Sequence, residues 1–538
     1  MFSKPRKLPN EHGINVLAMI WVYLIKTCGR KKARCVANGN PKMKGSVTLA
    51  NTYAACLEQA GARIFWATCA LRNKLVYGSD MSNAFEEAPP PKAPLYLKVD
   101  AAYKNWWKNK TGEDLDGDYY VKVQHAIQGH PESPRLWQLY IDSILKDIGF
   151  VATTHEPCVY RLPQHVLGEE MFLLRQVDDF ALGCDSTEAA EKVWKMIDSK
   201  MSAPLKREGL IRRFYGIDVE QTNEYIKILC PTYISKIMES KSFDLTTTQN
   251  KPIPMPSSPE FIRQMDSSIG PATDKEKQTL EKRMGFKYRA ATGELLFAMV
   301  TCRPDISNAV IKLTQFNANP DECHYNAVIQ VFQYLNATKR DGLIYWRKHM
   351  RNDLEAGTIP TVQPEEYSFH TQTEHDQSDQ AYVLVDSDWA GNVKTRRSVG
   401  GIAILMAGAA IIYKTILQRT VALSSTEAEF YALSEAGKLT LYVRSILNEL
   451  GIAQDEATSV YEDNQGCIHL TQSQKPTKRT RHVDMRYFAV LDWVEQDLLS
   501  IKKISTHDNS ADVLTKSLGR SLFYRHVDTL LGRRRPIV

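Results

Sequence analysis

The hydrophobic and polar positions in the first two thirds of the chain follow two different periods. Residues 14–245 mix continuous apolar runs typical of strands with amphipathic stretches typical of helices, which predicts a mixed α/β or α+β fold. Helical spacing returns at 283–340, where Ala291 and Leu295 share one apolar face. Residues 251–282 are rich in proline, serine and charge, so they predict a linker.

The last third of the chain predicts a separate mixed domain, preceded by a second polar linker at 349–380. Its pattern gives three strands, a helix, a strand, a helix and a strand. Ser424 and Glu427 form a capping box that starts the long helix, and Gly451 ends it. The strands are expected at 383–386, on both sides of Gly408, at 458–463 and at 498–506.

Composition narrows the class of protein. A chain of 538 residues predicts about three domains. Its 43% hydrophobic and 24% charged residues are ordinary for a folded protein, and a net charge of +6 means that any nucleic-acid contact must be local. The ten cysteines form no CxxC pair, which favours free thiols. Residues 1–13 lack a signal-peptide core, and the longest apolar stretch, 401–413, is too short for a bilayer span. We therefore expect an intracellular protein with no membrane partner.

Two acidic positions in the first half interrupt apolar segments. Asp178 and Asp179 break an apolar run at an expected hairpin turn, and Asp80 stands where a strand ends and a helix could start. Phosphoryl-transfer enzymes commonly use two Mg²⁺ ions about 4 Å apart, which need converging carboxylate oxygens. Taken singly, the alternatives are a polar turn and a helix N-cap.

Four more carboxylates stand at the ends of expected elements in the last third. Asp386 follows the first strand, Glu429 lies early in the capped helix, Asp463 ends the next strand, and Asp512 starts the last helical segment. The separations of 43, 34 and 49 residues mean that only folding could bring them together. Each alone could be a cap or a surface charge.

Three neighbours of these carboxylates leave alternatives open. Asp388 shares a loop with Asp386, which we prefer because it directly follows the strand. Glu427 precedes Glu429 by two residues and takes the capping role. His507 could move protons, although a solvated loop histidine is the safer interpretation.

The order of several short motifs resembles the polymerase palm of reverse transcriptases. Asp80 with the later aromatic Phe85 resembles its first motif, and Val177-Asp178-Asp179 resembles its metal-binding turn. Gln176 stands where relatives usually carry an apolar or aromatic residue. The resemblance implies nucleotide or template contacts at Lys32, Arg34, Phe85, Gln128, Gly129, Ser133 and Pro134.

Among reverse transcriptases, the sequence resembles those of copia-type (pseudovirus) LTR retrotransposon polyproteins. The Ser133–Trp137 run, Thr301–Asp305 and Ser425–Glu429 carry this likeness, which extends over residues 20–532. The last third resembles an RNase H fold, whose carboxylates Asp386, Glu429, Asp463 and Asp512 would hold metal. A basic cluster there resembles a hybrid-binding surface, with a solvated basic face as the alternative, and consists of Lys475, Lys478, Arg479 and Arg481.

The resemblance implies an α/β and α+β multidomain fold. A polymerase with fingers, palm and thumb-like parts would be followed by a connection segment and an RNase H fold domain. The predicted divisions are reverse transcriptase 14–250, linker 251–282, thumb- or connection-like helices 283–348, linker 349–380, RNase H domain 381–516 and basic tail 517–538.

The function so implied is an RNA-directed DNA polymerase with RNase H activity. Each site would use two Mg²⁺ ions, with Mn²⁺ as a substitute, and the partners would be RNA template, DNA primer, RNA–DNA hybrid and deoxynucleoside triphosphates. A cytoplasmic virus-like particle or the nucleus is the expected location. Two alternatives are a degenerate remnant that binds nucleic acid and an RNase H nuclease with an inert polymerase half.

Overall fold

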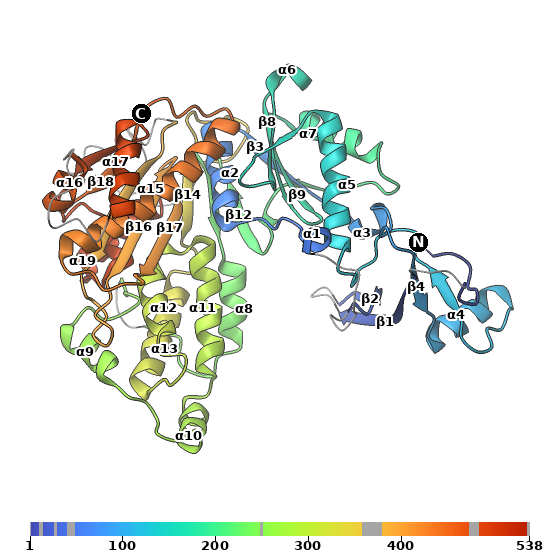
Figure 1. The fold of residues 1–538 in the computed structure, drawn as a ribbon, viewed down its shortest axis with the longest axis horizontal. Helices are drawn as coiled ribbons and strands as arrows, with labels where there is room; N and C mark the ends of the chain where they lie inside the picture. Colours follow the sequence, from blue (N-terminus) through green and yellow to red (C-terminus); the bar gives the residue numbers. More distant parts are fainter. Residues whose placement is uncertain are drawn as a thin grey trace. The chain divides into compact units, whose positions relative to one another are not determined.

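The computed structural model describes residues 2–9, 14–25, 29–39, 49–247, 251–357, 379–472 and 484–534. These residues form two compact units, each described by itself below (Figure 1). Unit 1 consists of Met1–Leu57, Val76–Ala152 and Pro157–Leu210, and unit 2 of Glu58–Leu75, Thr153–Glu156 and Ile211–Val538. The mixed α/β multidomain class expected from the sequence is confirmed.

The described residues of unit 1 form two sheets. The smaller has the order β2-β1-β4-β5, and its strands are β1 (Asn15–Ile25), β2 (Lys31–Ala37), β4 (Leu95–Lys98) and β5 (Tyr120–Lys122). The larger has the order β10-β3-β9-β8-β7-β6, with β3 (Leu75–Asp80), β6 (Val151–Ala152), β7 (Val159–Leu162), β8 (Met171–Gln176), β9 (Asp179–Cys184) and β10 (Lys206–Leu210). β3 and β9, which carry acidic residues at their ends, are neighbours in this sheet.

Amphipathic helices pack beside the larger sheet, where α7 contacts β9 and α5 contacts α7. α5 buries Trp137, Ile141 and Leu145, which repeat at the spacing of one helical face. The helices of this unit are α1 (Leu49–Thr52), α3 (Ala84–Glu87), α4 (Ala101–Thr111), α5 (Ser133–Ile148), α6 (Gln164–Leu167) and α7 (Thr187–Asp198).

Helix α2 (Gln59–Leu71) belongs to unit 2 although the sequence places it early in the chain. Every residue from Gly61 to Leu71 is buried, and apolar residues occupy most faces of the helix, as expected of a helix in the interior of a domain. Its Arg63 is 5% exposed and donates to the Ile411 and Val300 carbonyl oxygens, each at 2.7 Å. The predicted reverse transcriptase segment 14–250 is therefore divided between both units.

The middle of unit 2 combines a sheet with packed helices. The sheet order is β11-β12-β13-β14, with β11 (Arg213–Phe214), β12 (Ile217–Gln221), β13 (Tyr225–Leu229) and β14 (Gly342–Trp346). The helices α8, α11, α12 and α13 pack together (Figure 1). The helices of this region are α8 (Pro231–Glu239), α9 (Pro259–Ser267), α10 (Asp274–Met284), α11 (Tyr288–Cys302), α12 (Ser307–Thr314) and α13 (Glu322–Ala337), with a 3₁₀ turn at Pro304–Ile306.

Two segments differ from their expected character. The predicted linker 251–282 contains α9 and most of α10, because Ser258 and Thr273 each cap a helix through their hydroxyl groups. The predicted basic tail contains α19 (Arg520–Leu530), which buries Phe523, Val527 and Leu530 against the rest of unit 2. Both segments carry a short amphipathic pattern that forms helices. The prediction gave more weight to their prolines and charges than to this pattern. Most of the second predicted linker lies outside the described residues.

The C-terminal sheet has the order β17-β16-β15-β18-β19. β15 pairs antiparallel with β16 and parallel with β18, and the hairpin turn at Ala407 and Gly408 has positive φ at both residues, as a type I′ turn requires. Its strands are β15 (Tyr382–Asp388), β16 (Val399–Met406), β17 (Ala409–Leu417), β18 (Thr458–Glu462) and β19 (Leu499–Lys503). The helices are α15 (Ser425–Glu449), α16 (Gln465–Gln472), α17 (Asp484–Glu495), α18 (Asp512–Thr515) and α19. Within the described ranges, no helix has both the length and the hydrophobicity needed to cross a bilayer.

Candidate carboxylate sites

The first acidic group lies at the ends of two neighbouring strands of unit 1. Asp80 is the last residue of β3, Asp178 lies in the turn between β8 and β9, and Asp179 is the first residue of β9. The Met81 N–H donates to the Asp178 carbonyl oxygen at 2.8 Å, which ties the end of β3 to this turn. The fold thus brings the three residues to one edge of the sheet.

Burial and mutual repulsion set the electrostatics of this group. Burial, then Asp178 and Asp80, raise the pKa of Asp179 to about 6. Burial and the Asp80 charge also raise the pKa of Asp178, while Arg34 and Lys32 of β2 act in the opposite direction. Lys32 and Arg34 therefore lie within electrostatic reach of Asp178. Among the described residues, however, these three carboxylates do not form a group whose oxygens all come within 4.8 Å.

The turn between β8 and β9 has a strained backbone at Val177, which a hydrogen bond from Trp137 holds in place. Val177 has a φ of 54°, which a β-branched residue rarely adopts. Its carbonyl oxygen accepts a hydrogen bond from Trp137 Nε1 at 2.7 Å, and Trp137 is almost fully buried on α5. Such a conformation persists where surrounding contacts hold it. Gln176, which stands where relatives usually carry an apolar or aromatic residue, is also buried. Its side-chain oxygen accepts a hydrogen bond from the Leu57 N–H at 3.1 Å.

The template-type motif forms a loop against β2. The Ala37 N–H donates to the Gln128 carbonyl oxygen at 2.8 Å. Gly129 has a φ of 91°, and a Cβ at this position would lie 2.1 Å from the Ala37 carbonyl oxygen, so only glycine fits. Ser133, the first residue of α5, donates to the Ile127 carbonyl oxygen at 2.6 Å, and Pro134 follows it in the first turn of the helix. These residues fix the loop beside the strand that carries Lys32 and Arg34.

The aromatic of the first motif, Phe85, lies in the short helix α3 directly after β3. It is half-buried, whereas the neighbouring Met81 and Ala84 are buried. The structure therefore leaves Phe85 partly accessible in the segment that follows Asp80.

The second acidic group lies in unit 2, on the C-terminal sheet and the helix beside it. One carboxylate oxygen from each of Asp386, Glu429 and Asp463 lies within 4.8 Å of the others. Asp386 sits on the central strand β15, and Asp463 directly follows the parallel neighbour β18, so both approach the same edge. Because β15 continues to Asp388, Asp386 lies inside the strand and does not follow it, contrary to our sequence interpretation.

Asp512 joins this group through cationic and hydroxyl contacts. Lys516 Nζ lies 3.0 Å from Asp512 Oδ1 and 3.7 Å from Asp386 Oδ2. Thr515 lies one turn after Asp512, and its hydroxyl donates a hydrogen bond to the Asp386 carboxylate. Burial and Asp386 raise the pKa of Asp512, although Lys516 partly offsets them. Asp512 is thus in contact with Asp386, outside the group of three.

A fifth carboxylate, Glu462, was not expected from the sequence. It ends β18, is fully buried, and accepts from the Asn464 N–H at 2.9 Å through Oε1. Burial, then Glu462, Asp386 and Asp463, raise the pKa of Glu429, and burial likewise raises that of Glu462. The buried Oε2 atoms of Glu429 and Glu462 have no hydrogen-bond partner. Unpartnered hard oxygen atoms in a buried acidic group fit a divalent cation such as Mg²⁺.

The remaining alternatives have definite places. Glu427 Oε2 accepts from the Leu423 N–H at 2.7 Å, so it serves the start of α15 while Glu429 faces the acidic group. Asp388 ends β15, and burial raises its pKa. His507 is exposed in the loop before Asp512. The proposed hybrid-binding residues lie outside the described residues and are Lys475, Lys478, Arg479 and Arg481.

Comparison with known proteins gives a consistent family. The sequence model of the family described as reverse transcriptase (RNA-dependent DNA polymerase) matches residues 6–257. The retrovirus-related Pol polyprotein from transposon TNT 1-94 of Nicotiana tabacum is 28% identical over 513 residues, which are 94% of this chain and 34% of that protein. The corresponding polyprotein from transposon RE2 of Arabidopsis thaliana is 24% identical over 521 residues, 96% of this chain and 32% of that protein. The chain belongs to the copia-type retrotransposon polyproteins.

This retrotransposon chain spans about a third of the length of the curated polyproteins it matches. A solved foamy viral protease–reverse transcriptase in complex with double-stranded DNA is 12% identical, with 91% of this chain and 65% of that chain covered. Its TM-score of 0.41 adds nothing to the assignment.

Sequence reasoning missed residues of the retrotransposon chain that hold the carboxylates in place. Asn509 is fully buried, and its side-chain amide donates to the Val385 carbonyl oxygen at 2.7 Å, which fixes the loop before Asp512. Thr515 and Lys516 follow Asp512 by three and four residues, a spacing that places them on one helical face and could have identified them. Trp137 had no comparable signal, because its partner is a backbone atom 40 residues away.

Proposed function

We propose that the chain is an RNA-directed DNA polymerase with RNase H activity. The observation that carries the polymerase half is the placement of Asp80, Asp178 and Asp179 on neighbouring strand ends within the segment matched by the reverse transcriptase family. The RNase H half is supported by the group of Asp386, Glu429 and Asp463 on a separate sheet. Two acidic groups in two units fit two independent reactions.

Both groups fit divalent metal ions by the chemistry of their donors. Asp80, Asp178 and Asp179 would hold metal in unit 1, and Asp386, Glu429, Asp463 and Asp512 in unit 2. When bound, Mg²⁺ would stabilise the charge that develops on the reacting phosphate and favour deprotonation of the attacking oxygen. Burial raises the pKa of Asp179, and the charges of Asp178 and Asp80 raise it further. A bound cation would offset the repulsion between these carboxylates.

Other residues of unit 1 would bind and orient the polymerase substrates. Lys32 and Arg34, within electrostatic reach of Asp178, would pair with the triphosphate of a deoxynucleotide. The loop that contains Gln128 and Gly129, tied to β2, would position the RNA template. Phe85 would lie beneath the sugar and disfavour a 2′-hydroxyl. Substrate positioning of this kind supplies much of the acceleration in phosphoryl transfer.

One observation favours a second candidate, an RNase H nuclease with an inert polymerase half. One carboxylate oxygen from each of Asp386, Glu429 and Asp463 lies within 4.8 Å of the others, whereas Asp80, Asp178 and Asp179 do not form such a group among the residues described. In this alternative, water would attack the RNA strand at Asp386, Glu429 and Asp463, and no DNA synthesis would occur.

Primer extension and hybrid cleavage, measured in parallel on the full chain, separate these functions. With Mg²⁺, a DNA primer on an RNA template should be extended by deoxynucleoside triphosphates, and the labelled RNA of a hybrid should be cut. EDTA should abolish both reactions. Cleavage without extension would establish the nuclease alternative, and binding of both substrates with neither reaction would establish the non-catalytic remnant.

Removing the Trp137 indole N–H should impair extension selectively. In Trp137→Phe, the Val177 carbonyl loses its donor, a loss worth about 1 kcal/mol, so kcat for extension should fall about 5- to 10-fold. The KM for the nucleotide should change little, because Trp137 positions the turn and does not contact substrate. Tyr140→Phe on the same helix is the control, since it removes a donor to the Lys200 carbonyl and keeps the ring that lies beside Trp137. Equal losses in both variants would contradict a positioning role.

A further inference from the structure

Glu462, the last residue of β18, is a fully buried carboxylate beside the acidic group of unit 2. Burial raises its pKa, and the charges of Asp463 and Asp386 raise it further. The Asn464 N–H and the Lys503 ammonium act in the opposite direction, but Lys503 is exposed and donates to the Asp463 carbonyl oxygen. Burying an acid among other acids costs stability, so a residue in this position calls for a functional explanation.

The two carboxylate oxygens of Glu462 have different surroundings. Oε1 accepts from the Asn464 N–H at 2.9 Å. Because Asp463 lies between these two residues, this hydrogen bond fixes the turn that carries the Asp463 side chain. Oε2 has no hydrogen-bond partner among the described residues, and the same is true of Oε2 of Glu429.

The same turn is tied to the helix that carries Glu429. Asn464 Oδ1 accepts from the Cys467 N–H at 3.0 Å, in the first turn of α16, as an N-cap residue does. It also accepts from the Thr426 hydroxyl at 3.5 Å, and Thr426 precedes Glu429 by three residues on α15. Glu462 therefore belongs to a chain of contacts that joins the end of β18 to the start of α15.

Glu462 lies outside the group of three carboxylates whose oxygens come within 4.8 Å of one another. Its electrostatic effect on that group is nevertheless large: after burial, the Glu462 charge contributes most to the raised pKa of Glu429. This position suits a residue that acts on a cation through the ligands Glu429 and Asp463, without being a ligand itself.

We propose that Glu462 is a positioning residue for the divalent cation of unit 2. Its Oε1 holds the turn of Asp463, and its Oε2 adds a negative charge next to Glu429 that a cation must offset. The inference rests on the proposed function and deepens it, since it concerns the same metal site. Groups that contact metal ligands without touching the metal typically change metal affinity about 10–100-fold.

Mn²⁺ binding to the full chain, followed by the electron paramagnetic resonance signal of the free ion, tests the proposal without any reaction. The binding component that is lost in Asp463→Asn identifies the unit 2 site. Glu462→Gln keeps an oxygen acceptor for the Asn464 N–H and removes the charge, so the Kd of this component should rise at least about 10-fold. Without metal, Glu462→Gln should melt at or above the parental temperature, because a buried charge is removed. Its gain in melting temperature on adding Mn²⁺ should be smaller.

Two further variants separate charge from shape. Glu435→Gln removes a carboxylate of the same helix as Glu429 that pairs with exposed Lys438, and its Kd should equal that of the parent. Glu462→Asp keeps the charge on a shorter side chain and should bind Mn²⁺ more tightly than Glu462→Gln. An unchanged Kd in Glu462→Gln, an equal change in Glu435→Gln, or an affinity of Glu462→Asp no better than that of Glu462→Gln would overturn the proposal.

Failure of this role and failure of the proposed function give different results. If Asp463→Asn loses no Mn²⁺ component, the unit 2 metal site is refuted, and the role of Glu462 with it. Normal cleavage of the hybrid by the parent, with an unchanged Mn²⁺ affinity in Glu462→Gln, would refute the role of Glu462 alone. A weakened Mn²⁺ affinity in a chain that cuts no hybrid would refute the RNase H activity and leave the positioning role standing.

Discussion

Primer extension by the Asp178→Asn variant should fall at least ~10³-fold, while its cleavage of an RNA–DNA hybrid stays at the parental rate. Asp178 occupies the turn beside Asp179 and lies close enough to Asp80 for their charges to interact. Asparagine keeps the shape of the side chain and removes the negative charge that would hold a cation. Loss of a residue that only orients a metal ligand costs about 10–100-fold, and loss of the ligand itself should cost more.

The Asp463→Asn variant should show the opposite result. Asp463 belongs to the acidic group of unit 2, so RNA cleavage should fall by a similar factor and extension should be kept. The melting temperature of neither variant should fall below that of the parent protein, because each substitution removes one charge from a group of like charges. Loss of both activities in either variant would contradict two independent sites, and full extension by Asp178→Asn would remove the palm carboxylates from the mechanism.

The positions of the carboxylates could be predicted because they depend on local pattern. A polar residue that interrupts an apolar strand must lie at an end or an edge, and this holds for Asp80, Asp179 and Asp463. The prediction was weaker for Asp386, which lies within β15, because the buried Ser387 and the half-buried Asp388 continue the strand. Sequence pattern therefore placed these carboxylates near strand ends more reliably than it placed the exact ends of the strands.

What could not be predicted depends on contacts between distant segments. The sequence of α2 shows that it must be buried, yet nothing in it indicates that Arg63 bonds to Ile411 and Val300 in unit 2. In the sequence, Glu462 is indistinguishable from an ordinary strand residue. The fold places it close enough to Glu429 for their charges to interact, as a fifth acidic residue of this group. Backbone acceptors, such as the carbonyl oxygens of Ile411 and Val300, cannot be recognised from the pattern of side chains.

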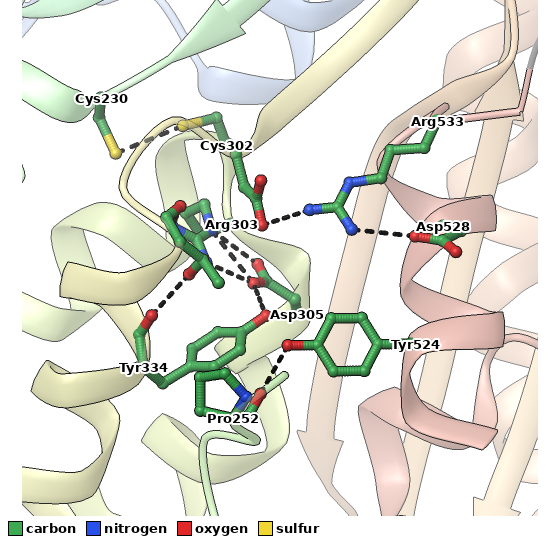
Figure 2. Close-up of polar contacts among 11 residues, drawn as sticks. Cys230, Pro252, Cys302, Arg303, Asp305, Tyr334, Tyr524, Asp528 and Arg533 are labelled. Atoms are coloured by element: carbon green, nitrogen blue, oxygen red, sulfur yellow. Dashed lines mark hydrogen bonds and ion pairs between the residues drawn. The ribbon is translucent and has the colours of Figure 1, made fainter. Parts of the chain in front are cut away.

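The Asp305→Ala variant should lose about 3–5 kcal/mol of the free energy of unfolding of unit 2. Arg303 and Asp305 have no exposed side-chain surface, and Arg303 Nη2 lies 2.6 Å from Asp305 Oδ2 (Figure 2). Although burial works in the other direction, the Arg303 guanidinium lowers the pKa of Asp305. Removing the carboxylate would leave a buried guanidinium without its counter-charge, and would also remove the acceptor of the Tyr334 hydroxyl, at 2.6 Å.

The source of this cost can be isolated with two further variants. The double variant Arg303→Met/Asp305→Leu removes both charges, so it should lose less stability than Asp305→Ala even though more polar contacts are gone. Glu435→Ala breaks an exposed pair with Lys438 and should cost less than about 1 kcal/mol. Because a chain of two units need not unfold in one step, hydrogen exchange in α13, which carries Tyr334, is the appropriate measurement. A loss for Asp305→Ala no larger than that for Glu435→Ala would mean that water or other groups replace the pair, and that burial alone holds Arg303 in place.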